Sequence, residues 1–382
     1  MINQETKVLI IGGGVHGTAL AAKFSEHGMR SFLIVDDQGL LKNWERLTSK
    51  LVHKSLRTPN TAHIDPRDAK SLCTDNSFLQ RMFCDERKPA RLASFNKRSK
   101  KVIERYDLQS KFRQGRVVDL HKCSHCGIFT AHVAGAHSTY TIQALRVVVA
   151  VGIGSPRMLP GNGSGNHRVF TAEATNVIKE LPCATSKIAV VGGGLTGATL
   201  AANFAEKGAD VTLFHRGQIT SQQLEVSSGW TRDGVDRYLF DVTFHEHHKK
   251  GMLRSARKRS TVTPAAEKRL YQSRCRLVTG TTVLSWEADE NSVSLKTPLA
   301  TFGHFDYVIF SLGYKSGIDR LKFLKRFTFR TEDGRPHLYP DLESKDVEGL
   351  FFMGYLAELQ LGPLGRNIPG AIEGSNRVVF AR

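Results

Sequence analysis

Residues 7–28 read KVLIIGGGVHGTALAAKFSEHG, and residues 187–208 read KIAVVGGGLTGATLAANFAEKG. The two stretches align without a gap. Three glycines, Gly12, Gly14 and Gly17, correspond to Gly192, Gly194 and Gly197, and Gly13 corresponds to Gly193. A single G-x-G-x-x-G pattern is weak evidence for a nucleotide site, but two copies in one chain are strong evidence.

Each copy stands in the context that a nucleotide-binding βαβ unit requires. A short β-branched run precedes the glycines, at Val8–Ile11 and Ile188–Val191, and an alanine- and leucine-rich helical segment follows them. A second apolar run, Phe32–Val35 or Val211–Phe214, completes the unit. The first glycine permits a tight turn, the second lets a pyrophosphate approach, and the third allows close helix–strand packing. The helix N-terminus then attracts the phosphates.

The residues that follow the second strands differ in charge. Asp36 and Arg216 stand at the same distance from the third glycine of their copies. A carboxylate there accepts hydrogen bonds from ribose hydroxyls, which suits FAD or NADH. A guanidinium there binds a 2′-phosphate and favours NADPH, although a solvent-exposed arginine at a strand end is the simpler alternative. We therefore expect FAD at the first copy and NADPH at the second.

The rest of the chain predicts that one unit is inserted in the other. The apolar stretches 145–154 (LRVVVAVGIG) and 307–314 (YVIFSLGY) bracket the second copy, as strands do where a chain leaves a domain and returns. We expect an α/β fold with two Rossmann-like three-layer domains. The FAD domain takes residues 1–160 and 304–382, and the NADPH domain takes residues 161–303.

The C-terminal stretch predicts a second contribution to the FAD site. It reads as a strand, a glycine-rich loop with Gly354 and Gly362, and a helix with Pro369 in its first turn. The amides of that first turn could face the part of a ring system that accumulates negative charge.

Composition limits the class of protein. A chain of 382 residues suits two domains. It contains no apolar run long enough to span a membrane, and its start lacks the charged region of a signal peptide, so we expect a cytoplasmic location. The six cysteines are scattered, which fits a reducing compartment.

The net charge of +18 is unusual, with basic residues concentrated in 81–116 and 249–259. A patch for nucleic acid or anionic lipid is one interpretation. No recognised nucleic-acid motif accompanies the charge, so solvated helix faces and attraction for two phosphate-bearing cofactors are the preferred explanation.

Taken together, these motifs resemble those of two-dinucleotide-binding flavoproteins. The chain is most similar to class B flavin monooxygenases, especially the branch that N-hydroxylates lysine or ornithine. Asp306–Tyr314 (DYVIFSLGY) resembles that family's D-x₃-[LF]-A-T-G-Y signature, and Val169–Glu173 (VFTAE) resembles its linker V-F-H-S-x-E/Y. Leu56–Pro59 and His63–Asp65 fall where the family has a loop near the flavin ring.

The resemblance implies that NADPH reduces FAD and that a C4a-hydroperoxyflavin then hydroxylates a small nucleophilic substrate, with a primary amine as the first choice. Small-molecule substrate and O₂ are then the partners, while the oligomeric state stays open. The family gives five candidates beside the flavin by position only: Arg57, Asn60, His63, Gln360 and Asn367. No catalytic acid or base is assigned, because the flavin carries the chemistry.

Two other functions remain open. An NADPH-dependent reductase of a non-dithiol acceptor is one, and a basic flavoprotein acting as a redox sensor or binding module is the other. A dithiol reductase needs a Cys-x-x-Cys beside the flavin, where this chain has only Cys183 before the second glycine motif.

The single Cys-x-x-Cys, Cys123 to Cys126, is predicted to lie in a turn between strands 116–120 and 128–133. With His121 and His125 it could bind a metal, but without a second half-site a hairpin turn is the preferred interpretation, and we expect no metal.

Overall fold

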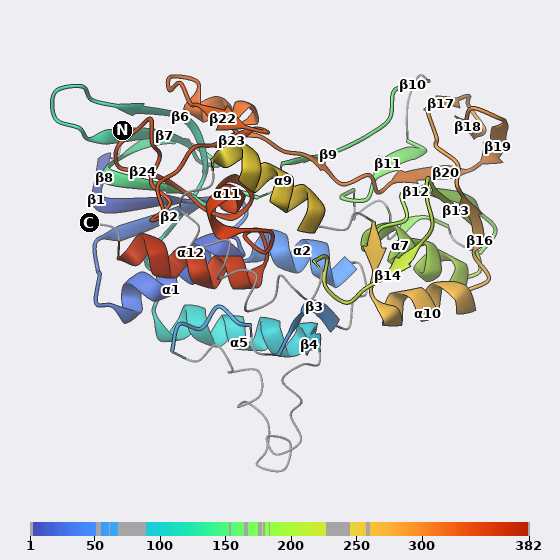
Figure 1. Cartoon of the computed structure of the whole chain (residues 1–382), viewed down its shortest axis with the longest axis horizontal. Coiled ribbons are helices and arrows are strands. Elements are labelled where there is room, and N and C mark those ends of the chain that lie inside the picture. Colours follow the sequence, from blue (N-terminus) through green and yellow to red (C-terminus); the bar gives the residue numbers. More distant parts are fainter. Residues whose placement is uncertain are drawn as a thin grey trace, which may run out of the picture.

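The computed structural model describes residues 3–50, 55–60, 62–67, 89–152, 154–163, 167–174, 178, 180–182, 184–226, 245–256 and 260–380. Two α/β units lie beside each other, joined by two strands of the chain (Figure 1). Within the described parts no helix is long and apolar enough to cross a membrane.

The first unit is built on a seven-stranded sheet with the order β5-β2-β1-β8-β7-β6, and β24 also pairs with β8. Its strands are β1 Asn3–Ile11, β2 Phe32–Asp36, β5 Phe112–Gln114, β6 Arg116–Lys122, β7 Phe129–Ala134, β8 Thr139–Val149 and β24 Leu350–Phe352. β1 pairs in parallel with β2 and β8, whereas β6, β7 and β8 form an antiparallel meander. The predicted hairpin around Cys123 is thereby confirmed.

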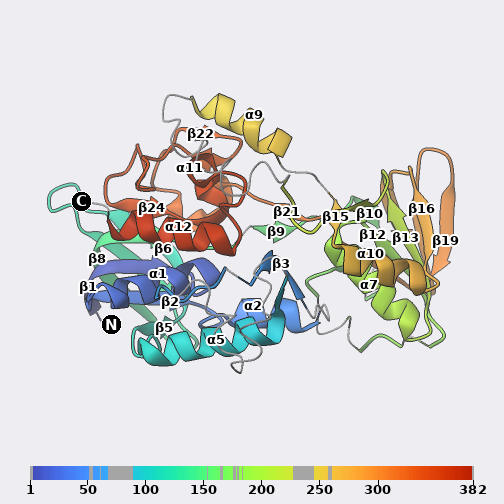
Figure 2. The same cartoon turned by 60° about the horizontal axis from the view of Figure 1, so that its bottom comes forward.

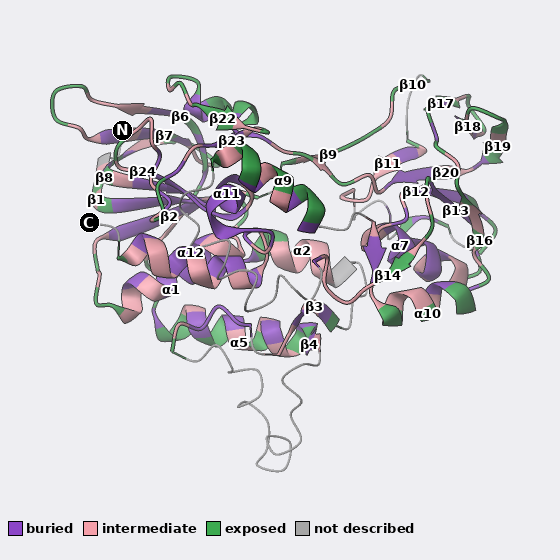
Figure 3. Cartoon of the chain, in the orientation of Figure 1, coloured by how far each residue is buried: buried purple, intermediate pink, exposed green. Residues whose placement is uncertain are grey.

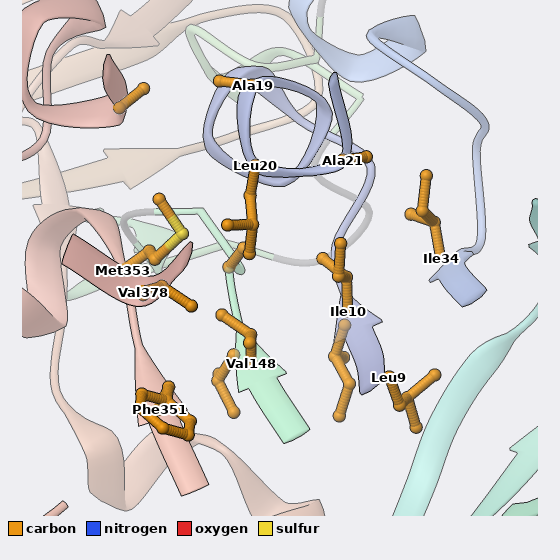
Figure 4. Packing of buried hydrophobic residues seen from close by; sticks show 14 of the residues in the cluster. Leu9, Ile10, Ala19, Leu20, Ala21, Ile34, Val148, Phe351, Met353 and Val378 are labelled. Atoms are coloured by element: carbon orange, nitrogen blue, oxygen red, sulfur yellow. The ribbon is translucent and has the colours of Figure 1, made fainter. Parts of the chain in front are cut away.

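Helices cover this sheet because its central strands are apolar on both faces. They are α1 Val15–Glu26, α2 Lys42–Lys50, α5 Leu92–Arg105 and α12 Ile368–Val379. α1 and α12 lie side by side in both views (Figures 1 and 2), although they come from opposite ends of the chain. Figure 4 shows Leu20 of α1 over Ile10 and Val148 of the sheet, with Phe351 and Val378 completing the same core.

The second unit contains a five-stranded parallel sheet with the order β11-β20-β12-β13-β16. Its elements are β11 Val169–Thr171, β12 Lys187–Val191, α7 Leu195–Glu206, β13 Asp210–His215, α10 Pro264–Gln272, β16 Arg276–Thr279 and β20 Tyr307–Phe310. A smaller sheet packs beside it with the order β10-β17-β18-β19: β10 Gly161–Asn162, β17 Ser285–Ala288, β18 Val293–Lys296 and β19 Thr301–Phe305. Both predicted βαβ units are therefore present, and the α/β fold is confirmed.

The chain crosses between the units along β9 (Ser155–Pro156) and β21 (Tyr314–Lys315), which pair antiparallel. Figure 2 shows these strands between the two units. The expected return to the first unit at residue 304 is wrong, because β20 pairs in parallel with β12 and β11 in the second sheet. The run 307–310 is apolar because it is buried inside that sheet, and the return follows at residues 314–315.

The remaining helices and short strands connect these layers. They are β3 Ser55–Pro59, β4 Pro89–Arg91, β14 Thr220–Ser221, α9 Glu246–Ala256, β15 Thr261–Val262, β22 Thr331–Glu332, β23 Arg335–Pro336 and α11 Glu358–Leu361, with short 3₁₀ turns at Ile318–Arg320, Lys322–Leu324 and Gly354–Ala357. Figure 3 shows that burial concentrates in the sheets and on the helix faces turned towards them. Parts of both basic stretches, residues 81–88 and 257–259, lie outside the described residues.

Candidate functional site

The first glycine turn connects β1 to α1 and leaves its outer side open. Gly12 has a φ of +113°, and a Cβ on it would lie 2.6 Å from the Ala150 carbonyl oxygen. A Cβ on Gly17 would lie 1.9 Å from the Gly12 oxygen, so the helix cannot approach the strand with any larger residue. A Cβ on Gly14, the N-cap of α1, would meet no described atom within 4 Å. No described side chain caps the helix there, so open space faces its first amides.

The second glycine turn repeats this geometry between β12 and α7. Gly192 has a φ of +122°, and its Cβ would lie 2.3 Å from the Ser311 carbonyl oxygen. A Cβ on Gly197 would lie 1.8 Å from the Gly192 oxygen, whereas one on Gly194 would again meet nothing within 4 Å of the described chain. Both turns thus offer an uncapped helix N-terminus with room for an anion, and they fit the pyrophosphates of two dinucleotides.

The Asp36 carboxylate accepts hydrogen bonds from the backbone of the first glycine turn and of the loop after β2. One carboxylate oxygen accepts a hydrogen bond from the Gly13 amide at 2.8 Å, and the other accepts from the amides of Gln38 at 2.8 Å and Gly39 at 3.0 Å. A carboxylate has about four acceptor positions, so these bonds leave capacity for a ribose hydroxyl. The sequence predicts a ligand-binding role for Asp36 but gives no sign of these hydrogen bonds within its own loop.

In the second unit, His215 rather than Arg216 occupies the place of Asp36. The last residue of β2 paired with β1 is Val35, and the last residue of β13 paired with β12 is Phe214. The next residues are therefore Asp36 and His215. The equivalence of Arg216 with Asp36 is wrong, because the connection from the helix to the paired strand is one residue shorter in the second copy. Arg216 is exposed and lies one position beyond the strand end.

The imidazole ring of His215 packs against Gly193 of the second glycine turn. A Cβ on Gly193 would lie 2.4 Å from that ring, so only glycine fits beneath it. The His215 side chain is buried, and its Nδ1 has no hydrogen-bond partner among the described residues. Burial, and secondarily the charge of Arg216, lower the pKa of His215 below its ordinary value. An unpartnered buried nitrogen beside an open phosphate-sized turn fits a ligand that completes the site.

The C-terminal segment forms a second wall beside the first glycine turn. Gly354, with a φ of +69°, faces the His16 ring, and a Cβ there would lie 3.6 Å from it. His16, in the first turn of α1, contacts the Gly365 carbonyl oxygen through Nε2 at 3.0 Å. Burial lowers the pKa of His16, although this hydrogen bond opposes the shift. Gly362 ends α11 with a φ of +74°, and Asn367 is the N-cap of α12 without a side-chain cap bond among the described residues. His16 therefore joins the first turn of α1 to the loop that precedes α12.

Arg57 connects the first unit to the second. Its guanidinium donates to the Gln222 carbonyl oxygen at 3.2 Å, to Thr261 Oγ1 at 3.1 Å and to the Thr261 carbonyl oxygen. In return, Gln223 Nε2 donates to the Arg57 carbonyl oxygen at 3.1 Å. Burial lowers the pKa of Arg57, which the nearby charge of Glu225 opposes. Asn60 stands in the turn directly after β3, the strand that carries Arg57.

Two further residues suggested by family position have structural partners. His63 is fully buried; its Nδ1 accepts from the Asp65 amide at 3.1 Å and its Nε2 contacts the Phe95 carbonyl oxygen at 3.2 Å. Gln360 is buried in α11, where its Nε2 donates to the Leu338 carbonyl oxygen at 2.8 Å. Both side chains therefore hold the surrounding backbone in place.

A buried ion pair beside Gly354 was not predicted from the sequence. Glu358 has no exposed surface, and the Arg335 guanidinium donates to its carboxylate from Nη2 at 2.8 Å and from Nε at 3.3 Å. The guanidinium also lies over the Tyr355 ring, 4.2 Å from its centroid. Burial acts to lower the pKa of Arg335, but the charge and hydrogen bond of Glu358, together with Tyr355 and Asp333, outweigh burial and raise that pKa. The residues are separated in sequence, so no local pattern signals the pair.

The described cysteines lie away from the glycine turns. Cys123 and Cys126 lie at the tip of the β6–β7 hairpin, and β6 is separated from β1 by β8 and β7. Cys275 directly precedes β16, and burial raises its pKa to about 11. Cys183 lies outside the described residues. The described glycine turns thus contain no thiol pair.

The fold and the paired glycine turns define a class of α/β oxidoreductase with two dinucleotide sites. The chain belongs to the pyridine nucleotide-disulphide oxidoreductase family, whose sequence pattern matches residues 6–371. That family binds FAD and NAD(P), and the chain is an oxidoreductase of this kind. A search of curated proteins found no match.

Solved structures share the fold over almost the whole chain. The ornithine N-hydroxylase of Kutzneria sp. 744 is 14% identical to this chain; the match covers 98% of both chains and has a TM-score of 0.82. The ornithine hydroxylase of Pseudomonas aeruginosa is 17% identical; the match covers 98% of this chain and 100% of the hydroxylase chain, with a TM-score of 0.75. The bacillithiol disulfide reductase of Bacillus cereus is 16% identical; the match covers 98% of both chains and has a TM-score of 0.64.

Proposed function

We propose that the chain is an FAD-dependent, NADPH-reduced monooxygenase that hydroxylates a small nucleophilic substrate, with a primary amine as the first choice. The observation that carries the proposal is the match to an ornithine N-hydroxylase over 98% of both chains, with a TM-score of 0.82. The thiol-free glycine turns of the described chain support it, because a dithiol reductase needs a cysteine pair at the flavin.

In this proposal the first unit holds FAD. The open turn of Gly12, Gly13, Gly14 and Gly17 and the N-terminus of α1 bind the pyrophosphate, and Asp36 accepts a ribose hydroxyl. His16 lies against Gly354 and contacts the loop before α12, so the segment with Gly354 and Gly362 and the uncapped N-terminus of α12 lie next to that turn. The amide dipoles of the α12 N-terminus stabilise negative charge on the bound ring system.

The second unit holds NADPH through the matching turn of Gly192, Gly193, Gly194 and Gly197. Arg216, exposed one position beyond the strand end, binds the 2′-phosphate with its charged fork. His215 Nδ1, buried and unpartnered in the described chain, hydrogen-bonds the same nucleotide. Arg57 holds the two units at the spacing that brings the cofactors together.

When bound and reduced, the flavin supplies the oxygen-activating chemistry. The protein positions nicotinamide and substrate and excludes water from the reacting atoms. Substrate specificity would then depend on side chains near the join between the units.

The direct test is incubation of the flavin-loaded protein with NADPH, ¹⁸O₂ and single amines such as ornithine, lysine and cadaverine. A hydroxylamine product with one labelled oxygen, formed in proportion to NADPH consumed, is the expected result. NADPH oxidation that yields only hydrogen peroxide with every amine would contradict amine hydroxylation.

A reductase is the second candidate, because the fold also matches a bacillithiol disulfide reductase over 98% of both chains. It predicts NADPH consumption that depends on an electron acceptor and proceeds without oxygen. Anaerobic assays with quinone and disulfide acceptors separate it from the monooxygenase.

A further inference from the structure

The outward face of the β6–β7 hairpin carries three side chains that ligate metals. Asp119 lies opposite His132 in the antiparallel pair, and His121 lies opposite Thr130. Their neighbours Leu120 and Ala131 are fully buried and point into the core, so the three ligating side chains point away from it. Figure 3 shows that this hairpin borders solvent.

A β-bulge places Asp119 on this face. Val117 pairs with Val133, and the next pair is Asp119 with His132, so Val118 is an extra residue in β6. If Val118 occupied an ordinary paired position instead, alternation from the buried Val117 would turn Asp119 towards the core. The bulge therefore assembles the group, since it brings a carboxylate beside two imidazoles held on paired strands.

The ligand atoms are close enough for a single ion. One ligand atom from each of the three residues lies within 4.8 Å of the other two. The rings of His121 and His132 stack with their centroids 5.6 Å apart and an angle of 29° between their planes. Zinc bonds to nitrogen and oxygen are roughly 2.0–2.2 Å long, so bound ligand atoms stand about 3.3 Å apart. Small side-chain rotations close the remaining difference.

We propose that Asp119, His121 and His132 form a surface site for a divalent transition-metal ion such as Zn²⁺. Two imidazoles and one carboxylate suit zinc and its neighbours, whereas Ca²⁺ and Mg²⁺ prefer oxygen ligands throughout. Three protein ligands leave a coordination position for water. The site is distinct from both glycine turns, and the proposal does not depend on the flavin reaction.

Arg326 would compete with a bound metal ion for the Asp119 carboxylate. Its Nε lies 3.0 Å and 3.2 Å from the two carboxylate oxygens of Asp119. The Arg326 side chain is 56% exposed and can move into solvent when an ion binds. The metal must share or displace this ion pair, so removal of Arg326 should strengthen metal binding.

The cysteine turn at the end of the same hairpin is the alternative metal site. The Cys126 amide donates to Cys123 Sγ at 3.5 Å, and this bond together with the other contacts from Cys126 and His125 lowers the pKa of Cys123. Thiolates bind zinc well, so an experiment must separate the two groups.

The experiment is a calorimetric titration of the purified, flavin-loaded protein with Zn²⁺, repeated with Co²⁺ while absorbance is recorded. The variants are His132→Ala, Arg326→Gln and the double variant Cys123→Ser/Cys126→Ser. His137→Ala is the matched control, because His137 is exposed in the turn between β7 and β8 and lies outside the group. Thermal unfolding without metal verifies that every variant is folded.

We expect the cysteine variant to retain one Zn²⁺ per chain. We expect His132→Ala to weaken binding at least about tenfold, His137→Ala to leave it unchanged, and Arg326→Gln to tighten it. The Co²⁺ spectrum should lack the intense thiolate charge-transfer band. The proposal is overturned if the wild-type protein binds no Zn²⁺, if the cysteine variant abolishes binding, or if His132→Ala behaves like His137→Ala.

Discussion

His215 of β13 stands in the second glycine turn where Asp36 of β2 stands in the first, each packed against the middle glycine of its turn. The two residues differ in what they offer a nucleotide. Asp36 is a carboxylate already held by three backbone amides, whereas His215 is a buried imidazole with an unpartnered Nδ1 in the described chain. The repeat thus preserves the turn and changes the residue packed against its middle glycine, which agrees with the proposal of two different nucleotides.

Replacement of Asp36 by alanine should lower flavin retention. The change removes a hydroxyl acceptor and also frees three amides that the carboxylate holds, each hydrogen bond to a charged group being worth about 1.5–3 kcal/mol. We expect the affinity for FAD to decrease roughly tenfold. The molar ratio of FAD to protein after gel filtration measures the resulting loss of bound flavin. The adjacent Asp37→Ala, whose carboxylate pairs with Arg116 at the surface, is the control. Equal flavin content in both variants would refute the assignment of Asp36.

Charge reversal at Arg216 should change nucleotide selectivity. Arg216→Glu is expected to raise the KM for NADPH at least about tenfold with little change for NADH, because only NADPH carries the 2′-phosphate. Steady-state oxidation of both nucleotides provides the comparison. Arg276→Glu is the matched control, since Arg276 is exposed at the opposite end of the same sheet. Parallel losses with NADPH and NADH would remove the proposed phosphate contact.

His215 should make the protein less stable in acid. Its folded-state pKa lies below the ordinary value of 6.5, chiefly because of burial. As the pH falls below that value the unfolded chain gains a proton that the folded chain does not, so stability decreases from there down to the folded-state pKa. His215→Phe keeps a ring against Gly193 and removes this titration. The midpoint of thermal unfolding, recorded from pH 7.5 to 5, should therefore decrease less in His215→Phe than in the wild type. The exposed His125→Phe should follow the wild type, and a His215→Phe curve parallel to the wild type would contradict the assignment.

Removal of the charge of Glu358 should destabilise the fold strongly. Glu358→Gln leaves the buried Arg335 guanidinium with only the partly exposed Asp333 carboxylate as counter-ion, and loss of a buried partner typically costs about 3–5 kcal/mol. Chemical denaturation of the flavin-free protein measures the change in the free energy of unfolding. The control is Glu287→Gln, which breaks an ion pair whose side chains are about half exposed and should cost less than about 1 kcal/mol. A similar loss in the two variants would show that the buried pair has no special structural role.

The amino-acid sequence by itself determined the two glycine turns and the βαβ units around them. These features depend on contacts between residues close in the chain: Gly17 must pass the Gly12 carbonyl, and no side chain larger than hydrogen fits. The hairpin around Cys123 was predictable for the same reason, since a turn between two short strands is a local structure.

The tertiary structure alone decided the features that join distant residues. It placed β20 in the second sheet, because an apolar run does not reveal which strand it will pair with. It set His215 opposite the glycine turn, because a connection shortened by one residue shifts the register. It also paired Glu358 with Arg335 and, through a bulge, gathered Asp119, His121 and His132 on one face. Each of these contacts depends on through-space packing and strand register, which a pattern of neighbouring residues does not encode.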